Sequence, residues 1–403
     1  MSTVSTRDDI AQPRLPAGIW VLGFVSLLMD ISSEIIHSLL PVYLLSVLGV
    51  GALTIGLIEG AAEATAQITK IFSGALSDYL GKRKMLAVLG YGLGAVTKPI
   101  FAVAPGVGWI LTARLTDRVG KGIRGAPRDA LVADLVPGSM RGAAYGLRQS
   151  LDTVGAFTGP LIAIGLMLLW ANDYQAVFWV AVIPATLAVG LLVFGVHEPN
   201  RPVTEPRRNP ISRIALRQLD RAYWWVVTLG AVFTLARFSE AFLLLRAESN
   251  GLAIAWMPIV MVTMNVAYAL SAYPCGKLAD RLNHQHLLMI GLCLLIIADI
   301  ILALGEHWLW TLAGSVVWGL HMGMTQGLLA TMVANAAPTS LRGTAFGFFN
   351  LVSGIALLIA SVLAGLLWQY GGPALTFYAG AGFCVVTLTG LALRPSKDRP
   401  TQA

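Results

Sequence analysis

LVADLVPGSMRGAAYG, residues 131–146, decides the fold of this chain because the chain contains the stretch twice. The second copy, MVANAAPTSLRGTAFG, occupies residues 332–347, and half of the sixteen positions are identical. Each copy joins two long apolar segments through a short turn with one arginine, Arg141 or Arg342. Membrane helices are connected in this way on the cytoplasmic side. The repeat therefore predicts a duplicated membrane bundle whose function lies between the halves.

The composition is that of a polytopic membrane protein. Charged residues make up 12% of the 403-residue chain, against about 25% in soluble domains, and the mean hydropathy is +0.71. The net charge of +7 gathers in short loops and tails, so it indicates topology and not a nucleic-acid surface. Cys275, Cys293 and Cys384 lie within apolar segments without pair spacing, so neither disulfides nor a metal knot are predicted. Because the polar N-terminus has no cleavable signal pattern, the first helix is expected to be retained.

A spanning helix needs about 20 mostly apolar residues. Twelve segments of the chain meet this requirement: 17–47, 51–79, 85–104, 108–135, 142–170, 174–196, 223–248, 252–280, 286–304, 308–336, 343–370 and 373–393. Alternate connections contain Lys or Arg, and the intervening ones contain neither. The positive-inside rule then places both termini and the central loop in the cytoplasm.

The predicted organisation has two six-helix bundles. Its parts are a tail at 1–16, an N-terminal bundle at 17–196, a basic linker at 197–222, a C-terminal bundle at 223–393 and a tail at 394–403. The later part of the linker fits either an amphipathic helix on anionic lipid or a solvated basic linker.

A cytoplasmic loop signature follows the second predicted helix. GALSDYLGKRK, residues 74–84, has the pattern G-x-x-x-D-x-x-G-[RK]-[RK], and GKLADR, residues 276–281, is a degraded second copy. With the six-plus-six layout, this signature resembles the major facilitator superfamily. The resemblance implies an all-α membrane protein with twelve helices in two pseudo-symmetric six-helix bundles, working by alternating access. It also implies a role in conformational gating for Gly74, Asp78, Gly81, Arg83 and Asp280.

The fifth predicted helix carries a second signature. Gly146, Gly155, Gly159 and Pro160 follow the spacing G-x8-G-x3-G-P, which resembles the antiporter motif of proton-coupled drug exporters in the superfamily. The resemblance implies a role in conformational gating for these four residues as well. A further glycine of that motif is replaced by Ala163. The alternative is a generic packing face, because small residues allow close helix approach and proline allows a kink.

Ionisable side chains form stripes within the apolar segments. Each costs about 2.5–3.5 kcal/mol at mid-membrane, so they are expected to face a cavity or one another. Asp30, Glu34 and His37 share one face of the first helix. Similar stripes occur on the second and fourth helices, at Glu59, Glu63, Gln67 and Lys70, and at Arg114, Asp117, Arg118 and Lys121. Ser33-Glu34 and Ser239-Glu240 occupy corresponding places in the two halves.

Proton coupling needs a carboxylate that changes charge during the cycle. Asp30 and Glu34 are the leading candidates, with Arg114 or Arg118 as partner and Asp152 as a further carrier. The family resemblance links an arginine at the place of Arg114 to coupling, whereas Arg118 stands where the pattern has glycine. Permanent ion pairs that only orient helices are the alternative. The predicted substrate cavity contains His37, Glu63, Lys98, Arg148, Arg237 and Glu240.

The leading functional prediction is proton-coupled efflux of a small molecule by a monomeric inner-membrane transporter in contact with lipid. The number of predicted cavity cations favours, as the alternative, a symporter or exporter of an anionic metabolite or chelate. A metal exporter using Asp30, Glu34 and His37, and a non-transporting sensor, have less support. No nucleotide loop or nucleophile elbow is present, so an enzyme is not predicted; nor are a cofactor, a resident metal or nucleic-acid binding.

Overall fold

The computed structural model describes residues 15–80, 82–137, 140–198, 218–279, 282–325, 328–338 and 341–393, and these ranges contain helices and no strands. The N-terminal half contains α1 (Ala17–His37), α2 (Leu40–Ser46), α3 (Ala52–Leu80), α4 (Arg83–Val103), α5 (Val107–Leu135), α6 (Arg141–Leu169), α7 (Tyr174–Val180) and α8 (Val182–Gly195). The C-terminal half contains α10 (Arg221–Ala236), α11 (Ala241–Ser249), η2 (Ile254–Trp256), α12 (Ile259–Ala279), α13 (His284–Leu304), α14 (Trp308–Thr325), α15 (Leu328–Ala336), α16 (Arg342–Gly371) and α17 (Pro373–Leu393).

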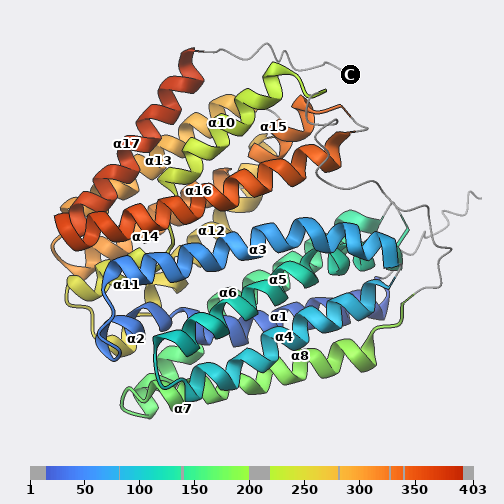
Figure 1. The fold of residues 1–403 in the computed structure, drawn as a ribbon, viewed down its shortest axis with the longest axis horizontal. Helices are drawn as coiled ribbons and strands as arrows, with labels where there is room; N and C mark the ends of the chain where they lie inside the picture. Colours follow the sequence, from blue (N-terminus) through green and yellow to red (C-terminus); the bar gives the residue numbers. More distant parts are fainter. Residues whose placement is uncertain are drawn as a thin grey trace, which may run out of the picture.

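The two halves form separate groups of helices that meet along α3 and α16 and along α6 and α12. In Figure 1 the N-terminal helices fill the lower part of the view and α10, α13 and α15–α17 the upper part, with α3 beside α16. The predicted all-α fold in two bundles is confirmed at this level.

Five of the predicted spans are interrupted, which the apolar pattern did not predict. Proline explains three of the breaks, because it cannot donate a backbone hydrogen bond to the residue four positions earlier. Pro41 follows the end of α1, Pro184 follows the end of α7, and Pro258 separates η2 from α12. A fourth break, at 237–240, separates α10 from α11, and the fifth separates α14 from α15.

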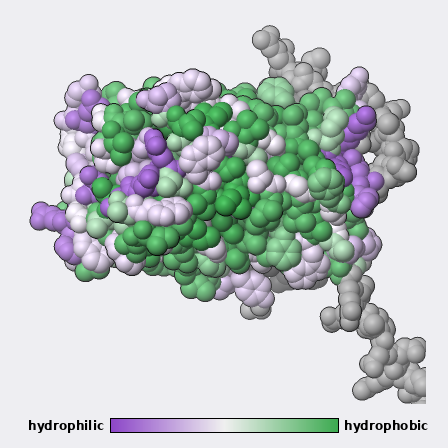
Figure 2. All heavy atoms as spheres, turned by 90° about the horizontal axis from the view of Figure 1, so that it is seen from below, coloured by the Kyte–Doolittle hydropathy of each residue, from purple (hydrophilic) through white to green (hydrophobic). Residues whose placement is uncertain are grey.

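Nine helical segments of the described chain are long and apolar enough to cross a membrane. α3, α5 and α14 fall outside this set. α3 and α5 have 29 residues each and are long enough to cross a membrane. They are left out because their ionisable stripes make them too polar. Figure 2 shows a face of the molecule that is hydrophobic over its middle, with hydrophilic residues mostly toward the two ends.

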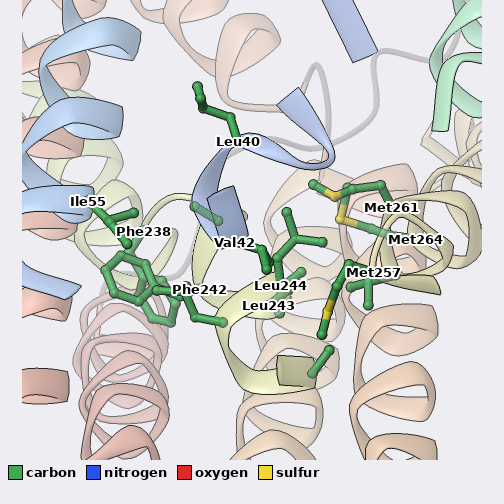
Figure 3. Close-up of a cluster of buried hydrophobic side chains, with 14 of the residues drawn as sticks. Leu40, Val42, Ile55, Phe238, Phe242, Leu243, Leu244, Met257, Met261 and Met264 are labelled. Atoms are coloured by element: carbon green, nitrogen blue, oxygen red, sulfur yellow. The ribbon is translucent and has the colours of Figure 1, made fainter. Parts of the chain in front are cut away.

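The hydrophobic core shows which end of the bundle is closed. One cluster joins the halves: Leu40, Val42 and Ile55 of the first half are grouped with Phe238, Phe242 and others of the second (Figure 3). Two further clusters each belong to a single half, one around Tyr91 and the other around Tyr223. We call the end with the joint cluster the closed end. The opposite end, where the chain passes from α3 to α4 and from α8 to α10, is the open end.

Close approach of α3 to α16 brings the halves together. A Cβ on Gly60 would lie 2.9 Å from Ser361 Cβ, and one on Gly365 would lie 2.7 Å from the Ala52 carbonyl oxygen. On the other side of the bundle, Asn265 Nδ2 donates to the Ala156 carbonyl oxygen at 3.3 Å. These contacts hold the two halves against each other along both sides of the bundle.

Candidate transport cavity

A cavity of about 470 Å³ lies between the two halves. The first half contributes residues of α1, α2, α3 and α5. The second half contributes residues of α10, the break after it, α11, α12, α14, α15 and α16. Of the residues predicted from sequence for coupling or for the cavity, eight line it: Glu34, His37, Glu63, Arg114, Arg118, Lys121, Arg237 and Glu240.

The N-terminal wall is a ladder of ion pairs between α3 and α5. Arg114 Nη2 lies 2.5 Å from Glu59 Oε2, and both side chains are buried. One turn further, Arg118 Nη1 lies 3.1 Å from Glu63 Oε1. The two pairs can form together because each helix presents its two charges at i and i+4 on one face.

His37 lies between the two arginines. Its Nε2 contacts Arg114 Nη1, and its Nδ1 is 3.2 Å from Arg118 Nη2. A guanidinium only donates, and a neutral imidazole has one acceptor nitrogen. His37 therefore accepts a hydrogen bond from one arginine and cannot accept from both.

The predicted pairing of Asp30 or Glu34 with Arg114 or Arg118 is not what the structure contains. The two arginines pair with α3 instead, since Glu59 and Glu63 stand directly opposite them. Glu34 lines the cavity, and within the described ranges its ion-pair partner is His37, with Nδ1 at 3.9 Å from Glu34 Oε1. Asp30 lies one turn away from Glu34, within electrostatic range of Asp152.

Lys98 and Arg148, both predicted for the cavity, lie outside its lining. Lys98 is 0% exposed; its Nζ donates to Asp117 Oδ1 at 2.9 Å and to Ser33 Oγ at 3.1 Å. Arg148 Nη1 donates to Asp152 Oδ2 at 2.7 Å. The partners of Lys98 belong to α1 and α5, so spacing along α4 could not predict them. Arg148 and Asp152 lie four residues apart on α6, so spacing along that helix does predict their pairing.

The glycines of the predicted antiporter motif pack against the acidic face of α1. A Cβ on Gly155 would lie 2.9 Å from Asp30 Cβ, and a Cβ on Gly159 would lie 2.7 Å from Glu34 Cβ. Pro160 is buried beside them in α6. Gly146 differs, because an added Cβ there meets nothing within 4 Å. The motif thus positions the two carboxylates through backbone contact.

The C-terminal wall is aromatic around two charges. Arg237 and Glu240 lie in the break between α10 and α11, and Arg237 Cζ is 5.8 Å from the Phe233 ring centre. Further apolar lining comes from Phe238, Trp318 and Phe349. Phe238 and Trp318 pack on each other with ring centres 5.6 Å apart.

Charges balance across the lining. It contains four carboxylates and four basic side chains: Glu34, Glu59, Glu63 and Glu240 against Arg114, Arg118, Lys121 and Arg237. Two of each are used in the ladder. Within the described ranges, Lys121 and Arg237 have no carboxylate within 4.0 Å, and Glu34 and Glu240 have no Lys or Arg within that distance.

The predicted site did not include Glu59 or the aromatic wall, whereas Lys121 is one of the expected cavity cations and does line the cavity. Glu59 was detectable from its position one turn before Glu63, which matches the spacing of Arg114 and Arg118. The aromatic residues of the wall could not be predicted from the sequence. They come from α10, the break after it, α14 and α16, and a single aromatic residue is common in any apolar helix.

The gating residues predicted from the loop signature, as far as the structure describes them, lie at the open end. Gly74 packs on α5, with an added Cβ 3.4 Å from Ala126 Cβ. Arg83 pairs with Asp134 and donates to the Ala130 carbonyl oxygen at 3.1 Å. These contacts lie within the N-terminal half. The side chain of Asp78, and the whole of Gly81 and Asp280, lie outside the described part of the chain.

Metal binding has no geometric support in the residues that the structure describes, where no group of three or more His, Cys, Asp and Glu side chains is arranged to hold an ion.

Comparison with known proteins gives one family. The profile described as Major Facilitator Superfamily matches residues 22–260 and 243–403. An uncharacterized MFS-type transporter of Methanocaldococcus jannaschii is 29% identical over 381 residues, covering 93% of this chain and 94% of that protein. Multidrug resistance protein MdtH of Yersinia pestis is 27% identical over 396 residues, covering 93% of each chain. The crystal structure of a POT family transporter in complex with a thioalcohol conjugated peptide superimposes with a TM-score of 0.78 at 15% identity, covering 94% of this chain and 96% of that one. The chain therefore belongs to the Major Facilitator Superfamily and is a multi-pass membrane transporter, not an enzyme.

Proposed function

We propose that this transporter exports an amphipathic small molecule in exchange for protons. The observation that carries the proposal is the pair Glu34 and Glu240. Each follows a serine in the first predicted span of its half. Both line the cavity, and neither has a Lys or Arg partner within 4.0 Å among the described residues. A carboxylate without a permanent partner can exchange a proton with water in the cavity.

The direction of transport is supported by one relative. By the positive-inside rule the open end, where the basic connections lie, is cytoplasmic, so this conformation admits substrate from the cytoplasm. The similarity to a multidrug resistance protein favours efflux. We place the protein in the inner membrane as a monomer, with both termini in the cytoplasm.

The two walls favour a substrate with an apolar body and a polar end. Phe233, Phe238 and Trp318 offer an aromatic surface, against which an apolar group loses contact with water. Lys121 and Arg237, the basic side chains outside the ladder, can bind an anionic group. Glu34 and Glu240 lie in the same cavity, so a zwitterion fits as well as an anion.

Everted membrane vesicles test the exchange. A panel of aromatic carboxylates, zwitterions and amines is added outside, where the cytoplasmic face is exposed, and luminal pH is followed with a trapped dye. Antiport raises luminal pH as substrate enters. Glu34→Gln and Glu240→Gln are expected to abolish the pH change, whereas Glu306→Gln, an exposed residue outside the cavity, leaves it intact. A full response in both cavity variants contradicts the proposal.

Anion–proton symport is a second candidate, favoured by the balanced charges of the lining. The empty, deprotonated cavity is formally neutral; protonation of Glu34 and Glu240 makes it positive, and a bound anion would restore neutrality. Symport predicts the opposite sign in the same vesicles, because substrate entry acidifies the lumen. Arg237→Gln is expected to weaken anion binding at least tenfold, about 1.4 kcal/mol.

A further inference from the structure

Buried polar atoms without hydrogen-bond partners gather behind the aromatic wall of the C-terminal half. Both carboxyl oxygens of Asp299 on α13 lack a partner, and so do Trp318 Nε1 and His321 Nε2 on α14. Asp299 and His321 are 0% exposed. His321 is anchored through Nδ1, 2.7 Å from the Gly291 carbonyl oxygen, whereas Asp299 has no such anchor.

Asp299 lies one aromatic layer behind the transport cavity. A Cβ on Gly380 of α17 would lie 2.7 Å from Asp299 Oδ2 and 3.1 Å from Phe238 Cε1, so the carboxyl and the phenyl ring meet at this glycine. Phe238 in turn lines the cavity and packs on Trp318. An ionised carboxylate is strongly disfavoured in such a buried, unpaired place, and the neutral acid costs much less free energy there.

The charged and titratable groups around Asp299 are few. On α17, Cys384 is within electrostatic range of both Asp299 and Arg237. On α14, His321 is within range of Arg237. Cys293, on α13 itself, completes the set. Arg237 also faces Glu240 and Tyr268. Among these groups it alone has a fixed positive charge, and no carboxylate lies within 4.0 Å of it in the described ranges.

We propose that Asp299 is a second proton-binding site of the transport cycle, gated by Phe238 and separate from Glu34 and Glu240. Phe238 belongs to the same helix break as Arg237, between α10 and α11. When this break rearranges, Phe238 leaves the carboxyl and Arg237 replaces it. The O–H bond of the acid then breaks, the proton passes to cavity water, and the carboxylate pairs with the guanidinium. The reverse movement returns a proton from water to Asp299.

Infrared difference spectroscopy of the purified, lipid-reconstituted protein tests this site without a substrate. The carbonyl stretch of a protonated carboxyl is expected at neutral pH and is expected to disappear in Asp299→Asn; Asp299→Ser is a second identifying variant. The band is also expected to fall when the pH is raised, as the proton leaves. A band that is absent in the wild type, or that persists unchanged over the whole pH range in which the protein stays folded, overturns the proposal.

Variants of Phe238 and of Arg237 test the proposed gate and the proposed counter-ion separately. Phe238→Leu is expected to speed the deuterium shift of the Asp299 band several-fold. The matched control is Phe349→Leu, another cavity aromatic, which packs on Gly230 instead and leaves the rate unchanged. Arg237→Gln removes the counter-ion, so the band should persist through the pH rise that removes it in the wild type. Equal exchange rates in the two phenylalanine variants, or loss of the band in Arg237→Gln as in the wild type, contradict the mechanism.

The inference rests on the proposed proton coupling, yet the two fail separately. If vesicle assays show no proton movement while the infrared band titrates as described, the coupling proposal is wrong and the site stands. If transport is coupled and the band never titrates, Asp299 is a structural acid.

Discussion

Arg118 connects α5 to two other helices: Nη1 lies 3.1 Å from Glu63 Oε1 on α3, and Nη2 lies 3.2 Å from His37 Nδ1 on α1. This side chain and Arg114, one turn before it, hold the polar wall of the cavity together. Because α1, α3 and α5 meet at these contacts, the wall can move as one body when the two halves rock against each other.

Arg114 and Glu59 form a buried ion pair, and removing either member alone is expected to lower the stability of the protein. Arg114→Met leaves a buried carboxylate without its partner and should lower stability by about 3–5 kcal/mol. The double variant Arg114→Met with Glu59→Met should recover most of that loss, because no uncompensated charge remains. Thermal unfolding in detergent measures both, and additive losses would show that the two residues act independently.

Releasing Arg118 should strengthen anion binding. In Glu63→Gln the carboxylate at 3.1 Å is replaced by a neutral amide, so the guanidinium becomes available to a ligand. Affinity for an anionic member of the transported panel should rise roughly tenfold, which corresponds to about 1.4 kcal/mol. Isothermal titration measures the affinity of Glu63→Gln beside that of the control Glu306→Gln, for which no change is expected. A fall in the affinity of Glu63→Gln would mean that Glu63 itself holds the substrate.

The close packing of α6 on α1 should be required for transport. An added Cβ on Gly159 would lie 2.9 Å from the Ile31 carbonyl oxygen as well as 2.7 Å from Glu34 Cβ. Gly159→Ala should therefore displace Glu34 and reduce transport at least tenfold while the protein still folds.

The control lies on the same helix. A Cβ on Gly165 meets nothing within 4 Å, so Gly165→Ala should leave transport intact and stabilise α6 by about 0.5–1 kcal/mol. If both alanine variants transport equally well, the glycines are only a generic packing surface.

Packing of α3 on α16 should set the balance between the two orientations of the cavity. In Gly60→Ala the new methyl group meets Ser361 Cβ at 2.9 Å and the Leu358 carbonyl oxygen at 3.1 Å. The closed end then packs less well, so the population open to the cytoplasm should fall. Labelling of Asn350→Cys, a cavity position, by a membrane-impermeant thiol reagent from the cytoplasmic side measures that population.

Gly92→Ala is the matched control for this shift, because a Cβ at Gly92 meets nothing within 4 Å. Native cysteines are replaced in both backgrounds. Identical labelling in the two glycine variants would rule out a role of this contact in the conformational equilibrium.

The sequence alone determined the membrane character, the two-bundle fold and the charged faces of the first, second and fourth helices. These features are local or periodic. Hydropathy follows from composition, the duplication is visible in residues 131–146 and 332–347, and i, i+4 spacing places side chains on one face without knowledge of any neighbour.

Only the tertiary structure decided which acid meets which base. Arg114 and Arg118 contact α3 because α3 and α5 lie side by side in register, and Lys98 is enclosed with Asp117 inside the N-terminal bundle. The break that carries Arg237 and Glu240, and the place of Asp299 behind Phe238, likewise depend on how helices from distant parts of the chain pack. Distances between helices are set by packing of the whole bundle, which spacing along a single helix does not encode.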